Sequence, residues 1–290
     1  MTVGAIVPVH GWAPYLAEAL DSVLAESPDE VVVVDDASPE PVALHHDHAQ
    51  RCTLVRRAER GGPAAARATG LRELDCELVA LCDADDAWRP GRLASQLTAL
   101  GEHPDAVVVF GRAVVVGPDD RPTGERWPEP APGRHQGPAL AASLFERNPI
   151  PTSSVLLRRA ALHAAGGFEG PVEVAEDWEL WLRLARAGGA FLCVAEATVA
   201  YRRRPGALTA DVAALARAQQ RVHELHADLV DAPIRERVAD RDRAALAAGL
   251  VRAGRHADAR ELMPPGVRRA ALGVPGLRAI AGRRDPYRSD

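Results

Sequence analysis

Glu77–Pro90 reads ELVALCDADDAWRP, and this stretch decides the fold class. The segment Glu77–Cys82 is apolar and has the length of a buried strand, and it ends in the acidic turn Asp83-Ala84-Asp85-Asp86. In open α/β sheets, ligands bind outside the carboxyl ends of the strands. The turn is therefore a candidate binding site as well as the end of a strand.

Strand and helix signals alternate upstream of this turn. Val3–Val9 and the valine-rich Glu30–Val34 favour strands, and Cys52–Val55 is a third candidate. Between them, apolar residues recur at helical spacing from Leu16 to Leu24, and Ala64–Leu74 favours a second helix. This alternation predicts an α/β protein with a mixed, mostly parallel sheet flanked by helices.

The downstream half continues the alternation and then changes character. Gly117–Pro138 is rich in proline and glycine, which predicts a long irregular loop that we expect to be mobile, and loops of that length are often functional lids or disordered segments. From about Ala210 onward, alanine, leucine and arginine predict a helical extension with a break at Pro264-Pro265. The remaining predicted elements are strands at Ala106–Phe110, Ala113–Val116, Phe191–Val194 and Thr198–Tyr201, and helices from Pro90 to about Leu100, at Arg159–Ala165 and at Asp177–Ala187.

Composition bounds the class of protein. The 290 residues are 47% hydrophobic and 26% charged, as in globular proteins. No stretch reaches the ~20 apolar residues that span a bilayer, and no basic segment precedes the N-terminal apolar run, so we expect a cytoplasmic protein. The four cysteines show no CxxC spacing, which argues against structural zinc. The net charge of −5 gives no reason to expect nucleic acid as a partner.

The chain contains no lysine, so all 35 basic residues are arginines. Any phosphate must then be bound by arginine, backbone amides, helix termini or a metal ion. This excludes a lysine-dependent phosphate loop and a lysine Schiff base.

A second acidic pair, Asp35-Asp36, follows the strand that ends at Val34. Two acidic turns at one edge of a sheet would face a common crevice. Their carboxylates repel one another and therefore favour a divalent cation such as Mn²⁺ or Mg²⁺. The alternative is that these residues only form turns and helix caps, where Asp is common.

Taken in order, short blocks of the sequence resemble family 2 of the glycosyltransferases, whose catalytic domain has the GT-A fold. The resemblance covers about residues 3–209, and we expect a catalytic domain over 1–209 and a helical extension over 210–290. The blocks are Pro8-Val9-His10-Gly11, Asp35-Asp36-Ala37-Ser38, Arg60-Gly61-Gly62 through Ala66-Arg67-Ala68-Thr69-Gly70, Asp83 to Pro90, Gly166-Gly167-Phe168, Glu176-Asp177-Trp178-Glu179-Leu180-Trp181-Leu182-Arg183 and Tyr201-Arg202-Arg203-Arg204-Pro205-Gly206.

The resemblance implies a set of donor-binding residues. Pro8, His10 and Asp36 match positions that hold the nucleoside base. Arg67 matches a position near the base and the diphosphate. Arg204 stands where many relatives have histidine, and we expect it to clamp the diphosphate. A solvated charged face is the plain interpretation of Arg202 and Arg203.

The resemblance also implies the chemistry. Asp83 matches a neighbour of the ribose and the metal, and Asp85 matches the main metal ligand. Asp177 matches the general base that takes the proton of the acceptor hydroxyl. The plain alternative for Asp177 is an acidic residue in the first turn of a helix, where the helix dipole favours it.

Together these residues predict an inverting glycosyltransferase that uses a nucleoside-diphosphate sugar and a divalent cation. The acceptor stays open among a polysaccharide, a lipid-linked glycan and a small molecule. The alternative is an inactive nucleotide-sugar-binding or scaffold protein of the same fold. A sugar nucleotidyltransferase is disfavoured because the chain lacks that class's Gly-rich N-terminal loop and catalytic lysine.

Residues 252–290 hold nine arginines and four acidic residues, a local charge of +5. The plain interpretation of this basic tail is a charged helix surface. The alternative is peripheral contact with anionic lipids at the inner membrane face.

Overall fold

A computed structural model describes residues 1–127, 131–204 and 211–262. The chain divides into two compact units, residues 1–204 and 205–290, and each is described by itself. Within the described residues, no helix has the length and apolar character that crossing a bilayer requires.

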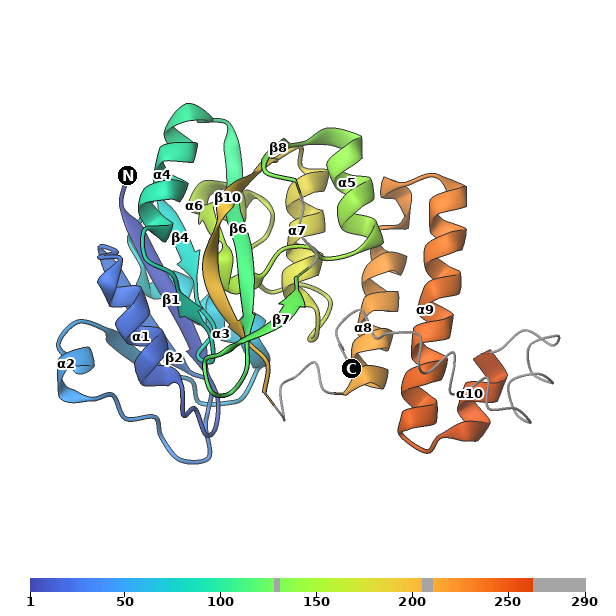
Figure 1. Cartoon of the computed structure of the whole chain (residues 1–290), viewed down its shortest axis with the longest axis horizontal. Coiled ribbons are helices and arrows are strands. Elements are labelled where there is room, and N and C mark those ends of the chain that lie inside the picture. The colour runs from blue at the N-terminus through green and yellow to red at the C-terminus, as the bar shows by residue number, and fades with distance from the viewer. Residues whose placement is uncertain (128–130, 205–210, 263–290) are drawn as a thin grey trace. The chain divides into compact units, whose positions relative to one another are not determined.

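The first unit is built on one mixed sheet, with the strand order β3-β2-β1-β4-β9-β6-β10-β5 and with β7 and β8 paired to β6 and β10 (Figure 1). β3, β2, β1, β4, β6 and β10 run in one direction, whereas β9, β5, β7 and β8 run in the other. The predicted α/β class with a mixed, mostly parallel sheet is confirmed. The strands are β1 (Val3–Val9), β2 (Glu30–Asp35), β3 (Thr53–Arg56), β4 (Leu78–Leu81), β5 (Ala87–Trp88), β6 (Ala106–Val116), β7 (Pro122–Arg126), β8 (Gly133–His135), β9 (Leu156–Arg158) and β10 (Ala190–Arg202).

Helices cover both faces of this sheet. Successive side chains of β1 point to opposite faces. Val7 packs in one core with Leu20 of α1 and Leu93 of α4, whereas Ile6 lies against Gly70 of α3. The helices of this unit are α1 (Leu16–Ala25), α2 (His46–Ala49), α3 (Gly62–Glu73), α4 (Arg92–Glu102), α5 (Gly137–Glu146), α6 (Arg159–Ala164) and α7 (Glu176–Arg186).

The close contact of α3 with the sheet gives a testable consequence. A Cβ atom at Gly70 would lie 2.7 Å from Ile6 Cγ2, so no side chain fits without a shift of the helix. We expect Gly70→Val to destabilise the protein by about 1–3 kcal/mol through overpacking, measured by urea denaturation. Gly101→Val on α4 is the control, because nothing lies within 4 Å of that Cβ position. Equal losses in the two variants would contradict this account of the packing.

Two predicted strand pairs are in fact single strands. β6 runs without a break through Gly111, and β10 joins the two segments predicted at 191–194 and 198–201. Glycine is needed at position 111, because a Cβ there would lie 2.3 Å from Thr198 Cγ2 on the neighbouring β10. A glycine inside a strand marks such close approach as readily as it marks a turn.

The prediction of an irregular loop over Gly117–Pro138 is wrong. The segment contains β7 and β8, and α5 begins at Gly137, while residues 128–130 lie outside the described residues. Trp127 is fixed by a 3.0 Å hydrogen bond from its Nε1 to the carbonyl oxygen of Pro149, and it packs against Tyr201 at a ring distance of 4.6 Å. The mobility expected of this segment stays a prediction.

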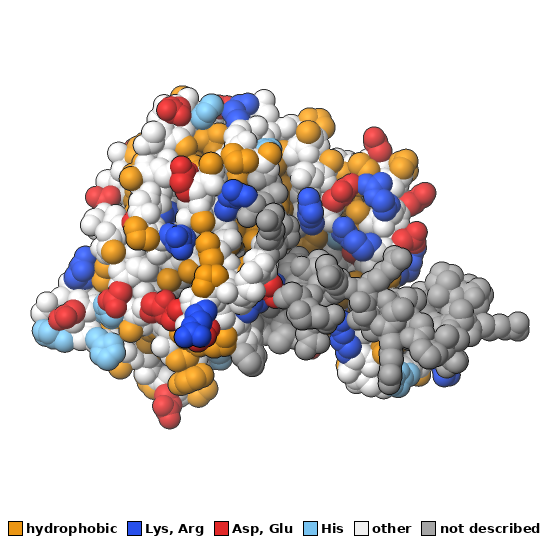
Figure 2. Space-filling model, viewed as in Figure 1, with side chains coloured by type: hydrophobic (Ala, Val, Ile, Leu, Met, Phe, Trp, Pro, Cys, Tyr) orange, Lys and Arg blue, Asp and Glu red, His pale blue; other side chains and the backbone are white. Residues whose placement is uncertain are grey.

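The histidine-rich segment at 45–48 contains the start of the short helix α2. His48 is buried, and its Nε2 lies 2.7 Å from Asp21 Oδ1 of α1. His45 and His46 remain exposed, and Figure 2 shows histidine side chains at the edge of the face where Figure 1 places α2. On the described part of the same face, charges of both signs are interspersed.

The second unit is helical in its described part, with α8 (Val212–Leu225), α9 (Ala232–Arg252) and α10 (His256–Leu262) around a small apolar core. Asp211 caps α8 by accepting from the backbone N–H groups of Ala213 and Ala214. α8 and α9 approach closely at Gly249, where a Cβ would lie 2.9 Å from the Ala213 backbone. The predicted break at Pro264-Pro265 and most of the basic tail lie outside the described residues.

Candidate active site

The candidate site lies at the carboxyl ends of β1, β2 and β4, which are adjacent in the sheet. The turn after β1 and the turn after β2 are joined by the His10 ring, whose Nδ1–H donates to the Asp36 carbonyl oxygen at 2.8 Å. The Gly11 N–H donates to Ser38 Oγ at 2.9 Å. Pro8 pairs with Val34 in the last part of the β1–β2 ladder. The structure thus brings together the three residues predicted to hold the base.

Asp36 is buried and its carboxylate lies at the start of α3. The N–H groups of Gly61 and Gly62 donate to it at 3.0 and 2.7 Å, and Arg57 forms an ion pair with it at 3.2 Å. The carboxylate therefore compensates the unpaired N–H groups that every helix N-terminus presents. Asp36 therefore stabilises the start of α3, in addition to the base-binding role that the sequence predicts for it.

Arg67, on α3, connects two acidic segments. Its Nη2 donates to Asp83 Oδ1 at 2.6 Å and its Nη1 donates to Glu176 Oε1 at 2.8 Å. Burial alone would lower the pKa of this guanidinium, but the carboxylates of Asp83, Glu176 and Asp177 outweigh it and raise the pKa above its ordinary value. Arg67 is therefore a permanent cation between the acidic turn after β4 and the start of α7.

Asp85 forms an ion pair with Arg204, whose Nε lies 2.7 Å from Asp85 Oδ2. Burial and the neighbouring Asp83 carboxylate raise the pKa of Asp85, although Arg204 opposes the rise. Negative charge is thus crowded in this turn, and a guanidinium partly compensates it.

Asp177, at the start of α7, accepts hydrogen bonds on both carboxylate oxygens. Thr152 Oγ1 donates to Oδ2 at 2.6 Å, Asn148 Nδ2 donates to Oδ2 at 3.2 Å, and the Trp178 N–H donates to Oδ1 at 2.7 Å. These hydrogen bonds fix the orientation of the carboxylate. Asp177 also lines a small pocket, together with Arg67, Leu81, Thr152, Phe168, Glu176, Leu180 and Trp181.

Several residues of this site were not predicted from the sequence. Glu176 lines the pocket beside Asp177, and burial raises its pKa to about 7 against the opposing charge of Arg67, with the Asp177 carboxylate adding to the rise. Ser153 Oγ donates to Asp86 Oδ2 at 2.6 Å and accepts from the Asp83 N–H. The Glu-Asp block contained a signal for Glu176, whereas nothing in the local sequence marked Ser153.

Arg202 corrects the interpretation of the closing block as a solvated face. Its side chain is 0% exposed, and its Nε donates to the Asp85 carbonyl oxygen at 2.9 Å. Its backbone N–H donates to Asp86 Oδ1 at 2.8 Å. Arg203 lies at the surface in part, paired with Glu125.

The acidic turn fits a divalent cation only in combination with a ligand. Within the described residues, no three His, Cys, Asp or Glu side chains gather as a metal site. Mg²⁺ is commonly held by one or two carboxylates together with substrate phosphates. Asp83 and Asp85 would supply two such carboxylates. A cation bound to them would also relieve the repulsion between the two side chains, which contributes to the raised pKa of Asp85.

Comparison with known proteins identifies relatives of this chain. A protein of Mycobacterium tuberculosis called pre-mycofactocin glycosyltransferase is 29% identical over 202 residues, which are 64% of this chain and 39% of that protein. An uncharacterized glycosyltransferase of Rickettsia felis is 27% identical over 63% of this chain and 31% of its own length. The chain thus spans less than half the length of these curated relatives.

Solved structures share the fold at low sequence identity. The mannosyltransferase PcManGT from Pyrobaculum calidifontis, in complex with GDP-Man and Mn²⁺, aligns with a TM-score of 0.60 and 21% identity over 97% of this chain and 78% of that one. S. aureus TarS 1–349 in complex with UDP-GlcNAc aligns with a TM-score of 0.58 and 16% identity over 97% and 88% of the two chains. These likenesses confirm the predicted GT-A type of fold.

The sequence model described as Glycosyl transferase family 2 matches residues 5–163, more than half of the chain. This range contains the turns after β1, β2 and β4, and thus the larger part of the candidate site. The chain therefore belongs to glycosyl transferase family 2.

Proposed function

We propose that this protein transfers a sugar from a nucleoside-diphosphate sugar to an acceptor hydroxyl, with inversion at the anomeric carbon. One observation carries the proposal: Arg67 binds Asp83 of the acidic turn and Glu176, the neighbour of Asp177, at the same time. One buried guanidinium therefore joins the acidic turn predicted to bind the donor to the residue that precedes the predicted base.

On the donor side, Pro8, His10 and Asp36 would border the base, and Asp83 and Asp85 would hold a divalent cation on the diphosphate. The cation, when bound, stabilises the negative charge that develops on the leaving diphosphate. Arg67 supports this assignment, because its buried Nε has no hydrogen-bond partner within the described residues. Buried polar groups are otherwise nearly always paired, so an N–H of this kind suits a ligand oxygen.

Arg204 would contribute the second cationic side chain. It is partly exposed, and its one ion pair in the described structure is with Asp85. In a chain without lysine, a guanidinium near the diphosphate supplies both charge and directed N–H donors. We infer that Arg204 contacts the diphosphate when Asp85 binds the cation.

On the acceptor side, Asp177 would remove the proton of the attacking hydroxyl. Its hydrogen bonds from Thr152, Asn148 and the Trp178 N–H leave acceptor capacity on the carboxylate, which has about four lone-pair sites. A single base with no covalent intermediate implies direct displacement, and direct displacement inverts the anomeric centre. The acceptor itself is not specified by these contacts.

Donor binding tests the proposal directly. The related structures hold GDP-Man with Mn²⁺ and UDP-GlcNAc, so UDP, GDP and their sugars are the first ligands to examine. We expect one of them, with Mn²⁺ and at 100 times its Kd, to stabilise the protein by about 2.7 kcal/mol in a thermal-shift assay. Excess EDTA should remove most of this shift.

A turnover measurement distinguishes an active glycosyltransferase from an inactive nucleotide-sugar-binding protein of the same fold. Donor binding without release of the nucleoside diphosphate, in the presence of acceptor extracts, would favour the scaffold. NMR of the product anomer then tests inversion. A donor shift that is unchanged in EDTA would overturn the metal assignment but not the donor class.

A further inference from the structure

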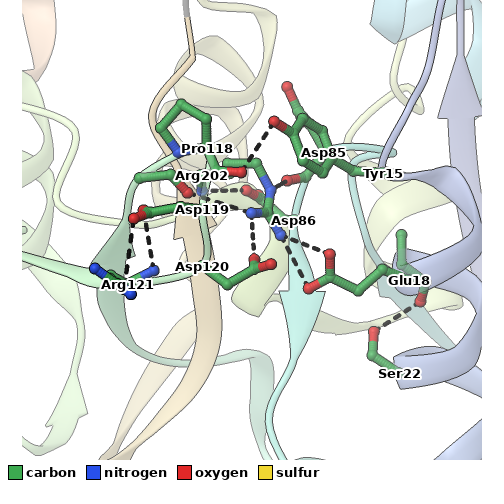
Figure 3. A network of polar contacts seen from close by, with 12 residues as sticks. Tyr15, Glu18, Ser22, Asp85, Asp86, Pro118, Asp119, Asp120, Arg121 and Arg202 are labelled. Carbon is green, nitrogen blue, oxygen red and sulfur yellow. Dashed lines mark hydrogen bonds and ion pairs between the residues drawn. The ribbon is translucent and has the colours of Figure 1, made fainter.

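Arg202 lies at the end of β10 and contacts three separate parts of the first unit (Figure 3). Its Nη2 donates to both carboxylate oxygens of Glu18 on α1, at 2.9 Å each. Its Nη1 donates to Asp120 and to the Gly117 carbonyl oxygen in the turn between β6 and β7. The third contact, through Nε, is the one to the Asp85 carbonyl oxygen.

The guanidinium is fully satisfied by these contacts. Its five N–H groups all have acceptors, and the Tyr15 ring lies under it at 4.0 Å from the ring centre. The two carboxylate partners are only partly shielded, with Glu18 43% and Asp120 58% exposed. Arg202 is thus a buried charge that is fixed from the surface by two accessible acidic residues.

Arg202 forms two hydrogen bonds with the acidic turn, one to Asp85 and one to Asp86. The Nε bond fixes the backbone at Asp85, and the Arg202 N–H fixes the side chain of Asp86. The Arg202 side chain therefore connects the turn to α1 and to the β6–β7 turn, while its backbone N–H connects the turn to β10. Asp120 supports this from a left-handed backbone conformation, with φ of 64°, which Asp and Asn tolerate better than most residues.

We propose that Arg202 is a positioning residue that, through Glu18 and Asp120, holds the Asp85-Asp86 turn in the geometry required for cation binding. This inference rests on the proposed function, in which Asp85 binds the cation with the diphosphate. A turn that is free to move must be ordered when the cation binds, and that ordering weakens the binding. Groups that orient metal ligands typically change metal affinity about 10–100-fold when they are removed.

The test uses the double variant Glu18→Gln/Asp120→Asn, which leaves Arg202 in place and keeps side-chain size. Asn also tolerates the backbone conformation of Asp120. We expect the Mn²⁺ dissociation constant, measured from the EPR signal of free Mn²⁺ at saturating nucleoside diphosphate, to rise about tenfold or more. At saturating Mn²⁺, the nucleotide Kd should stay within about twofold of wild type, because no nucleotide contact is lost.

Arg158→Gln is the matched control. Arg158 on β9 is another arginine with backbone carbonyl partners, donating to Ala106 and Pro104 at 2.8 and 2.9 Å, and it contacts no residue of the acidic turn. It should lower the melting temperature and leave the Mn²⁺ constant unchanged. An equal Mn²⁺ constant in wild type and in the double variant would overturn the positioning role. A wild-type protein that binds nucleoside diphosphate but no Mn²⁺ would overturn the metal assignment and, with it, this inference.

Discussion

Replacing Asp177 with Asn is expected to reduce kcat by about 10²–10⁴-fold, the usual effect of removing a general base. Asn keeps the size of the side chain and its oxygen still accepts from Thr152 Oγ1, which donates to Asp177 at 2.6 Å. It cannot take a proton from the acceptor hydroxyl. Because the base acts mainly in the transition state, the loss should fall on kcat rather than on donor binding.

The measurement is kcat and donor Kd for Asp177→Asn beside wild type, once an acceptor is found. The donor Kd should stay within a few-fold, since this side chain is not among those predicted to contact the diphosphate. Asp258→Asn is the control, because Asp258 lies in the first turn of α10 and has no proposed role in catalysis. Its loss should cost about 0.3–1 kcal/mol of stability through the helix dipole and leave kcat unchanged. If Asp177→Asn behaves like Asp258→Asn, Asp177 is not the base.

Replacing Asp85 with Ala is expected to abolish turnover and weaken binding of the nucleoside diphosphate, while the protein remains folded. Burial and the Asp83 carboxylate raise the pKa of Asp85, so its ionised form opposes folding when no cation is bound. A raised carboxyl pKa contributes stability at low pH that is lost as the pH rises through it. At neutral pH, removing this carboxylate should therefore keep the ligand-free melting temperature or raise it.

For Asp85→Ala, the melting temperature is measured by scanning calorimetry and the donor Kd by titration calorimetry. The ligand-free melting temperature should be equal to that of wild type or higher, and the donor Kd should become insensitive to Mn²⁺. Asp105→Ala is a suitable control, because this exposed carboxylate pairs with Arg134 away from the acidic turn. Full activity of Asp85→Ala would contradict its assignment as metal ligand.

The fold was largely predictable because its signals are local. The valine-rich strands and the periodic helices on either side of Asp83 have the correct order, and the structure places Asp36, Arg67 and Asp83 at one edge of the sheet. Among the exceptions are β7 and β8, which lie in a segment rich in proline and glycine. Pro122 begins β7 and Gly124 adopts a positive φ of 77°, so composition typical of a loop is compatible here with a short strand.

The supporting contacts of the site were not predictable, because they join distant parts of the chain. Arg202 and Glu18 are 184 residues apart, and Ser153 and Asp86 are 67 apart. A run of three arginines has the same local sequence whether it is solvated or buried. Only the tertiary structure shows that Arg202 is buried while Arg203 remains partly exposed.

The contact between Asp36 and the start of α3 restricts how donor preference can be engineered. The carboxylate that would recognise the base also accepts from the N–H groups of Gly61 and Gly62, and the same helix carries Arg67. A substitution at Asp36 made to change the preferred nucleobase would therefore also disturb the helix that orients Arg67. Libraries directed at new donors should keep Asp36 and vary His10, whose ring hydrogen-bonds to the backbone oxygen of Asp36.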